Sequence, residues 1–394
     1  MGFRLTELHL RGFRNHLNFD LENISSNTIF VGANATGKSS LLEAVQLLCM
    51  LDSFRTTKWV NLVNGELDCC QLNGRFEQDD RLHQVQMNIV EGKREYLFNG
   101  KSRRLSDMAK IVPAIIFTPD DLSLVKGSSE QRRTMVDSLG KRLSAQYGQI
   151  LADYQKTLRQ RNAILRDRQK ARLFDATPSN EELVWSDRLA ELGARLTVFR
   201  HRLFLRLVTQ TAKHYRELSG GETLTADYRC SFNASPTNSE PETAEFLVEP
   251  ETVKALMVEA LEQRRVDEYV RGLSLVGPHR DEVVFYVDGR DARDFASQGQ
   301  QRSIALAIKL AEMDLISEIV GEDVILLLDD VLSELDHNRR EQLLLLCSKA
   351  SQCFITTTDL NSIPEGPFRQ GTIIELGSET MMFETAVAVK EEDA

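Results

Sequence analysis

The stretch GANATGKSS, at residues 32–40, constrains the fold of this chain more than any other part of the sequence. It matches the pattern G-x-x-x-x-G-K-S/T, follows the apolar run NTIFVG and precedes SSLLEAVQLLCML, whose leucines recur at helical spacing. A strand, a glycine-containing loop and a helix in this order turn backbone N–H groups and a helix N-terminus toward one anion. The sequence therefore predicts an α/β fold built around a phosphate-binding loop.

The residues of this loop have separate roles in binding ATP and Mg²⁺. Gly32 and Gly37 permit unusual torsions and a close approach of the backbone to phosphate. Lys38 reaches the β- and γ-phosphates, which gives it a catalytic as well as a binding role, and Ser39 supplies a hydroxyl to Mg²⁺. The alternative, a glycine-rich turn with a chance Lys-Ser pair, does not account for the flanking strand and helix. The predicted phosphate contacts are Gly32, Ala33, Asn34, Ala35, Thr36, Gly37, Lys38 and Ser39.

A second apolar run, VILLLDD at residues 324–330, ends in two adjacent carboxylates. A strand this apolar belongs inside a sheet covered on both faces, and its carboxylates need a positive partner there. In folds with a phosphate-binding loop, such a strand brings an acid to the metal. We predict that Asp329 holds Mg²⁺ through water and that Asp330 accepts the proton of an attacking water. The alternative role, capping the next helix, suits Ser333 and Asp336 better.

Two stretches could supply a third nucleotide-binding element, LSGGE at 218–222 and SQGQQ at 297–301. SQGQQ opens a long helical pattern just ahead of the aspartate strand, whereas LSGGE runs into TLTADYRCSF, which alternates like a strand. A helix N-terminus at Ser297, Gln298 and Gly299 can offer N–H groups to a γ-phosphate. We therefore predict that SQGQQ is the signature element and that LSGGE is a turn.

The remaining patterns divide the chain into lobes. Long charged helical patterns from residue 128 to 215, with one break, predict an antiparallel helical arm. The predicted parts, in chain order, are the first part of an ATPase lobe at 1–117, a helical arm lobe with an acidic loop (236–250) at 118–270, the second part of the ATPase lobe at 271–386, and a disordered tail at 387–394.

Composition limits the cellular setting and the partners. The formal net charge is −11, but residues 141–172 hold nine basic and two acidic side chains, so a local patch can still bind a polyanion. No apolar run approaches the roughly 20 residues of a membrane span, and the N-terminus lacks the hydrophobic core of a signal peptide. The six cysteines have no metal-ligand spacing. We expect a cytoplasmic protein with no membrane partner.

Together, the motifs resemble those of the RecF family, bacterial recombination-mediator ATPases related to SMC-type heads. The matching stretches follow the family's order: LRGFRNH, GANATGKSSLLEA, FTPDDLSLVKGSSEQRR, GPHRDEVVF, ASQGQQRSIALAIKLAE and LLLDDVLSELD. The resemblance implies an ABC/SMC-head-like lobe with an inserted helical arm lobe. It also implies an ATP-dependent homodimer that binds gapped or duplex DNA and works with RecR and RecO to load RecA in recombinational DNA repair and replication.

The same resemblance implies roles for further residues. The segment Ser297–Gly299 would contact the γ-phosphate held by the other subunit, and residues 333–336 would form the loop that crosses this interface. Arg14 would lie near the phosphates, and Thr358 would occupy the switch position. A surface charge and a capping hydroxyl are the alternatives for these two side chains.

One departure from the wider ABC pattern concerns the rate of ATP hydrolysis. Asp330 stands where most ABC-type heads have Glu. Because the shorter acid lies farther from the attacking water, we expect slow, DNA-stimulated ATP hydrolysis that acts as a switch.

Candidate DNA contacts are basic residues of the arm. Arg159, Arg166 and Lys170 share one side of a predicted helix, and Arg132 and Arg133 precede them. The alternative is a solvated helix face. Because few aromatic residues are interleaved, we expect phosphate contact with duplex rather than stacking on bases. Little sequence preference and a steep salt dependence follow.

Two other classes of protein could use a similar ATPase head. A transporter motor would need a coupling surface for a membrane partner, whereas this chain inserts a charged arm. A nuclease-associated ATPase would need an appended acidic metal-binding domain, and we expect none after residue 380.

Overall fold

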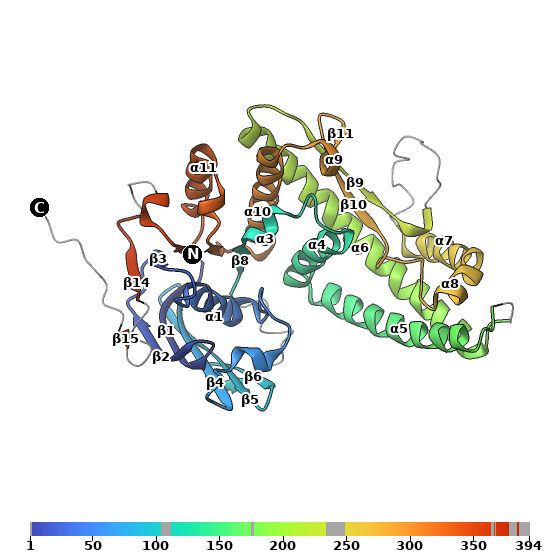
Figure 1. The fold of residues 1–394 in the computed structure, drawn as a ribbon, viewed down its shortest axis with the longest axis horizontal. Helices are drawn as coiled ribbons and strands as arrows, with labels where there is room; N and C mark the ends of the chain where they lie inside the picture. Colours follow the sequence, from blue (N-terminus) through green and yellow to red (C-terminus); the bar gives the residue numbers. More distant parts are fainter. Residues whose placement is uncertain are drawn as a thin grey trace, which may run out of the picture. The chain divides into compact units, whose positions relative to one another are not determined.

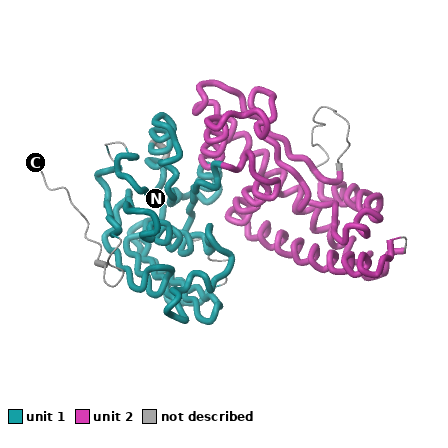
Figure 2. Tube along the Cα trace, viewed as in Figure 1, with its two compact units in different colours: residues 1–122, 312–394 teal, residues 123–311 magenta. Residues whose placement is uncertain are grey.

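In the computed structural model, the described residues are 2–103, 112–174, 177–233, 249–363, 366, 368–377 and 384–385. The chain divides into two compact units, one formed by residues 1–122 with 312–394 and the other by residues 123–311 (Figure 2). The predicted α/β fold with a helical insertion is confirmed. The tail predicted at 387–394 and most of the acidic loop lie outside the described residues.

The first unit contains a five-stranded parallel sheet in the order β14-β3-β13-β12-β8. Its strands are β3 (Asn27–Gly32), β8 (Ala114–Phe117), β12 (Ile325–Asp329), β13 (Gln352–Thr357) and β14 (Thr372–Leu376). Figure 1 labels three of these strands, β14, β3 and β8. Every residue of β12 and β13 is buried, as expected for a parallel sheet covered on both faces. Because the strands are parallel, β3, β12 and β13 end at the same edge of the sheet.

A second, mostly antiparallel sheet in the same unit has the order β15-β2-β1-β4-β5-β6-β7. Its strands are β1 (Arg4–Phe13), β2 (His16–Glu22), β4 (Cys69–Gln78), β5 (Arg81–Val90), β6 (Lys93–Phe98), β7 (Lys101–Ser102) and β15 (Glu384–Thr385). The helix α1 (Lys38–Met50) packs against strands of both sheets. Its leucines share one hydrophobic core with Leu5 and Phe76 of the second sheet and Ile325 of the first. The phosphate-binding loop therefore leads into a helix enclosed by two sheets.

The second unit is built from helices and a small sheet. Its elements are α4 (Ser129–Leu143), α5 (Ala145–Lys170), α6 (Asn180–Ser219), β9 (Leu224–Arg229), α7 (Pro250–Gln263), α8 (Arg265–Arg271), β10 (Glu282–Val287), β11 (Arg290–Asp291) and α9 (Ala292–Phe295). Ser128 begins α4 with a capping box, because its hydroxyl accepts from Gln131 N while the Gln131 side chain accepts from Ser128 N.

Helices α5 and α6 form the predicted antiparallel pair. Tyr147, at the start of α5, contacts Phe199 in the middle of α6, whereas Arg161, later in α5, donates through Nε to Ser186 Oγ near the start of α6 at 2.9 Å, so the two helices run in opposite directions. Apolar side chains of both helices, among them Tyr154 and Leu192, form a core between them. The helix pair is therefore stabilised by buried apolar side chains between α5 and α6, and its charged residues lie mainly on the surface.

The boundary of the second unit differs from the expected one. We expected the arm lobe to end at residue 270, whereas the unit continues to residue 311. Strand β10 pairs with β9 along its whole length, from Glu282 opposite Arg229 to Val287 opposite Leu224. This pairing joins segments that are far apart in the sequence, so local pattern could not reveal it.

Three helices complete the described structure, together with four short 3₁₀ segments. The helices are α3 (Pro119–Leu122), α10 (Gln298–Val320) and α11 (His337–Cys347). The 3₁₀ segments are η1 (Trp59–Leu62), η2 (Ser231–Asn233), η4 (Leu332–Glu334) and η5 (Leu360–Ser362). Helix α10 runs across the boundary between the two units. Within the described residues, no helix combines the length and the apolar character that a membrane crossing requires.

The GPHRDE segment places a histidine inside the second unit. The His279 ring contacts Tyr154 Oη at 2.7 Å through Nδ1 and Ser274 O at 3.0 Å through Nε2. Burial lowers the pKa of His279 to about 4, against the opposing effect of the Ser274 carbonyl. This imidazole is therefore neutral in the folded protein near pH 7.

We expect the free energy of unfolding to decrease as the pH falls from about 6.5 toward 4, because the unfolded chain then binds a proton that folded His279 does not. His279→Gln should reduce this slope by up to about 1.4 kcal/mol per pH unit. Urea unfolding at several pH values measures the slope. The exposed residue His337 gives the control, His337→Gln. Equal slopes for the wild type and His279→Gln would contradict the prediction.

Candidate nucleotide-binding site

The phosphate-binding loop connects β3 to α1 with the predicted backbone geometry. Gly37, the residue before α1, has a φ of 100°, in the left-handed region that favours glycine. A Cβ at this position would lie 2.5 Å from Asn15 Nδ2 and 2.5 Å from His16 Nε2. Glycine is therefore required at position 37 both for the torsion and for the close approach of the segment that follows β1.

Lys38 lies across the loop. It is buried, and its Nζ donates to the carbonyl oxygens of Gly32 and Ala33, both at 2.7 Å. Burial lowers the pKa of Lys38, while the nearby carboxylates of Asp330 and Asp329 oppose that shift. The ammonium group is held at the edge of the sheet where the two aspartates lie, in a position suited to polyphosphate.

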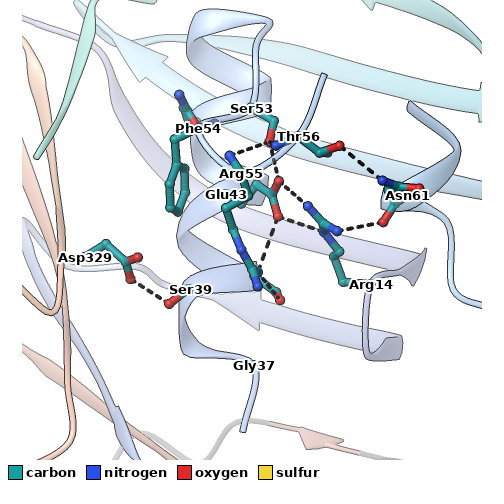
Figure 3. A network of polar contacts seen from close by, with 12 residues as sticks. Arg14, Gly37, Ser39, Glu43, Ser53, Phe54, Arg55, Thr56, Asn61 and Asp329 are labelled. Carbon is teal, nitrogen blue, oxygen red and sulfur yellow. Dashed lines mark hydrogen bonds and ion pairs between the residues drawn. The ribbon is translucent and has the colours of Figure 1, made fainter. Parts of the chain in front are cut away.

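Ser39 and Asp329 come together as the sequence predicted. Ser39 Oγ donates to Asp329 Oδ1 at 2.7 Å, which joins the start of α1 to the end of β12 (Figure 3). A hydroxyl and a carboxylate are oxygen ligands of the kind that Mg²⁺ prefers, and Mg²⁺ usually keeps several waters and phosphate oxygens besides. Among the described residues, no group of three or more His, Cys, Asp or Glu side chains could hold a metal without such help. The pair therefore fits a magnesium ion that is shared with phosphate.

Thr356 is a residue of this site that sequence reasoning missed. It lies opposite Asp329 in the pairing of β12 with β13. Its Oγ1 donates to Asp329 Oδ1 at 2.9 Å and accepts from Asp330 N at 2.9 Å. One hydroxyl thus orients both aspartates. The run of three threonines at the end of CFITTT was the available signal, although it does not say which threonine faces the acid.

Asp330 is oriented differently from Asp329. Its φ of 50° is uncommon for a residue other than glycine, and such outliers concentrate at functional sites. Its Oδ1 is buried and has no hydrogen-bond partner among the described residues. Burial raises the pKa of Asp330, while the Ser333 hydrogen bond and Lys38 oppose that shift. An oxygen with spare accepting capacity beside Lys38 is what a group that orients or deprotonates water needs.

A buried carboxylate organises two arginines beside the loop. Glu43, on α1 one turn after Ser39, is fully buried and accepts from Arg14 Nε at 2.9 Å and Arg14 NH2 at 2.7 Å (Figure 3). Arg55 NH1 lies 3.7 Å from the same carboxylate, and Ser53 Oγ donates to it at 2.5 Å. Glu43 was not singled out from the sequence.

The two arginines of this cluster border a cavity of about 540 Å³. Lys38, Arg14 and Arg55 line it together with Ser39 and Asp330. The volume lies within the range of small-molecule sites, and three cations facing two oxygen-bearing groups favour a polyanionic ligand. Arg14 thus borders the predicted phosphate site, paired with Glu43 rather than standing as an isolated surface charge.

The remaining nucleotide candidates lie at element ends. Ser297 caps α10, because its Oγ accepts from Gln300 N at 3.2 Å, so Gln298 and Gly299 form the first turn as predicted. Thr358 is exposed directly after β13, at the edge of the sheet that carries the loop. LSGGE is a turn, as predicted, since α6 ends at Ser219 and β9 begins at Leu224.

The arm candidates for DNA divide into two groups. Arg159, Arg166 and Lys170 are exposed on α5. The expectation that Arg132 contacts DNA is wrong, because this side chain is 3% exposed and donates to Gly127 O at 2.7 Å and to Glu282 at 2.8 Å. Arg133 is half-buried and donates to Asp281 O at 2.6 Å. Both arginines hold the start of α4 against the small sheet, a role that only long-range contacts reveal.

The Glu43 cluster leads to a prediction about stability. Arg14→Met should lower the free energy of unfolding by about 3 kcal/mol, because it leaves the buried Glu43 carboxylate without its bidentate partner. The double variant Arg14→Met/Glu43→Gln should recover part of this loss, because no buried charge then remains unpaired. Urea unfolding of the wild type, both single variants and the double variant measures the coupling. Strictly additive losses would contradict the proposed pairing.

Comparison with known proteins agrees with these features. The family model described as RecF/RecN/SMC N terminal domain matches residues 4–369. A DNA replication and repair protein RecF from Listeria innocua serovar 6a is 36% identical over 370 residues, which cover 93% of this chain and 96% of that protein.

Two solved structures of the recombination mediator protein RecF in the RecFOR pathway are also similar. The first, named with ATPrS, has a TM-score of 0.85, and the second, named with ATP, has a TM-score of 0.80. Each is 28% identical to this chain and covers 95% of it, with 96% of the solved chain matched. The chain therefore belongs to the RecF family of DNA replication and repair proteins, which have an SMC-like ATPase fold.

Proposed function

We propose that this protein is an ATP-switched DNA-binding protein of recombinational repair and replication in the bacterial cytoplasm. The observation that carries the proposal is the contact of Ser39 with Asp329 beside Lys38, which unites three elements of a nucleoside triphosphate site at one sheet edge. Family membership adds the repair context, and the similar solved structures named with ATP and ATPrS support the choice of nucleotide.

The geometry suggests how the residues would act on ATP. Lys38 would exchange its two carbonyl contacts for β- and γ-phosphate oxygens, and the loop N–H groups would hold the same phosphates. Bound Mg²⁺, held by Ser39 and by Asp329 through water, would neutralise charge on the phosphates. Asp330 would use its buried Oδ1, which has no partner among the described residues, to orient the attacking water and accept its proton.

The signature residues belong to the other side of a dimer in this proposal. Ser297, Gln298 and Gly299 lie at the N-terminus of α10, where the helix dipole favours an anion. We propose that they contact the γ-phosphate bound by a second copy, so that ATP closes the dimer and slow hydrolysis releases it. Residues 333–336 would cross this interface, and Thr358 would occupy the switch position, as the family resemblance implies.

The exposed basic side of α5 is the proposed DNA contact. Arg159, Arg166 and Lys170 are spaced seven and then four residues apart, which places them on one side of the helix. Such a stripe neutralises backbone phosphate and carries little sequence information, as gapped or duplex DNA would require. Cooperation with RecR and RecO in loading RecA, and stimulation of hydrolysis by DNA, belong to the same proposal.

The nucleotide switch can be tested with two substitutions. Lys38→Met should abolish ATP-dependent dimerisation, because the β- and γ-phosphates lose their cation. Asp330→Asn should still bind ATP but should hold the dimer closed, because the water loses its base. Sedimentation with ATP over time measures both effects, and Asp323→Asn, an exposed acid just before the other end of β12, is the control. An Asp330→Asn dimer that dissociates as fast as the wild type would exclude Asp330 as the base.

The DNA contact can be tested through its salt dependence. The double variant Arg159→Glu/Arg166→Glu should weaken duplex binding and flatten the plot of log K against log salt by about 0.9 per lost phosphate contact. The same charge change at exposed residues of the second sheet, Arg81→Glu/Lys93→Glu, is the control. Fluorescence anisotropy at several salt concentrations gives the slopes. An unchanged slope for the α5 variant would place the DNA site elsewhere.

A further inference from the structure

The turn LSGGE has a structural role that the proposed function leaves unexplained. It begins with the last two residues of the 40-residue helix α6 and reverses the chain through Gly220 and Gly221, whose φ values are 75° and 119°. Strand β9 begins two residues after Glu222. The turn therefore joins the end of the longest arm helix to the small sheet of the second unit.

Glu222, the last residue of the motif, uses both carboxylate oxygens. Its Oε2 accepts from Tyr215 Oη at 2.6 Å, and its Oε1 accepts from Gln300 Nε2 at 3.0 Å. Tyr215 is fully buried and lies on the last turns of α6, whereas Gln300 lies in the first turn of α10. The carboxylate thus connects a fixed residue of the arm to the predicted signature helix.

Gln300 passes this connection on to the residue that caps the helix. Its Oε1 accepts from Ser297 N at 2.9 Å, while its own backbone N donates to Ser297 Oγ at 3.2 Å. Together these bonds form a capping box. Because Glu222 occupies the amide nitrogen of Gln300, the amide oxygen must face Ser297, so the bond to Glu222 fixes which end of the amide completes the box.

The turn is held from the other side as well. Thr223 N donates to Asp288 Oδ1 at 2.9 Å, and Asp288 N donates to Thr223 O at 2.9 Å. Asp288 lies between β10 and β11. The Glu222 carboxylate thus bonds a buried tyrosine, and the residue that follows it is tied to the β10–β11 turn, so both its side chain and its backbone are held in place.

We propose that Glu222 is a positioning residue for the signature. Through Gln300 it holds Ser297 and the first N–H groups of α10 in place for the γ-phosphate bound by a second copy of this chain. Through its bond with Tyr215, it also connects the end of α6 to the start of α10. This inference rests on the proposed function, because it assigns Glu222 a task in the ATP-dependent dimer rather than in the fold alone.

Three full-length variants test the role of Glu222. Glu222→Ala removes both acceptors. Glu222→Gln can keep both bonds, because its oxygen can accept from Gln300 while its amide donates to the Tyr215 hydroxyl. Glu217→Ala is the matched control, because Glu217 is an acid on the last turn of α6 whose side chain is 67% exposed.

The readouts separate positioning from folding. A fluorescent ATP analogue should bind the monomer of all three variants as it binds the wild type, because the phosphate-binding loop does not include Glu222. The association constant of the ATP-dependent dimer should fall about tenfold for each site that Glu222→Ala alters. A dimer with two equivalent sites should therefore lose up to about a hundredfold. Glu222→Gln and Glu217→Ala should remain within about threefold of the wild type. The variant Gln300→Leu should weaken dimerisation as Glu222→Ala does, and combining the two should add little further loss.

Two outcomes would overturn the inference. In the first, Glu222→Ala dimerises as tightly as the wild type. In the second, the losses of dimer affinity caused by Glu222→Ala and Gln300→Leu simply add in the double variant, which would mean that Glu222 does not act through Gln300 and Ser297. The proposed function would fail in a different way, because the wild type itself would then remain a monomer at saturating ATP.

Discussion

Asp329 is a carboxylate buried at the end of an apolar strand, where a negative charge without hydrogen-bond donors would destabilise the sheet. Ser39 and Thr356 supply those donors, and they come from the two elements that the sheet brings to the same edge. The parallel pairing of β3, β13 and β12 is thus what places a hydroxyl of the loop beside an acid 290 residues later in the chain. The other features of the nucleotide site depend on this arrangement.

Helix α1 carries two kinds of polar group into an apolar layer. Ser39 donates to Asp329, and Glu43, one turn later, holds Arg14 and approaches Arg55. A buried Glu is tolerated here because guanidinium and hydroxyl donors satisfy it. The same arrangement brings two positive charges to the border of the cavity, so the packing of this helix and the attraction of the cavity for phosphate have a common origin.

The second unit uses arginine in two ways. Arg132 and Arg161 are buried, and each donates to a carboxylate and to further oxygen acceptors. Arg159 and Arg166 lie on the same arm, yet they are exposed. The buried arginines hold the helices together, whereas the exposed arginines remain accessible to a ligand. The charge density of residues 141–172 therefore overstates the number of side chains that DNA could reach.

Sequence by itself determined the parts of this protein that depend on local pattern. The loop pattern between an apolar run and a leucine-rich helix, the acids after VILLLDD and the helix start at SQGQQ each depend on neighbours a few residues away. Only the tertiary structure decided that Thr356 orients both aspartates, that Glu43 holds Arg14, that Arg132 is buried and that β10 joins β9. These contacts join residues that are distant along the chain. Strand register and side-chain burial select them, and neither quantity can be read from one segment alone.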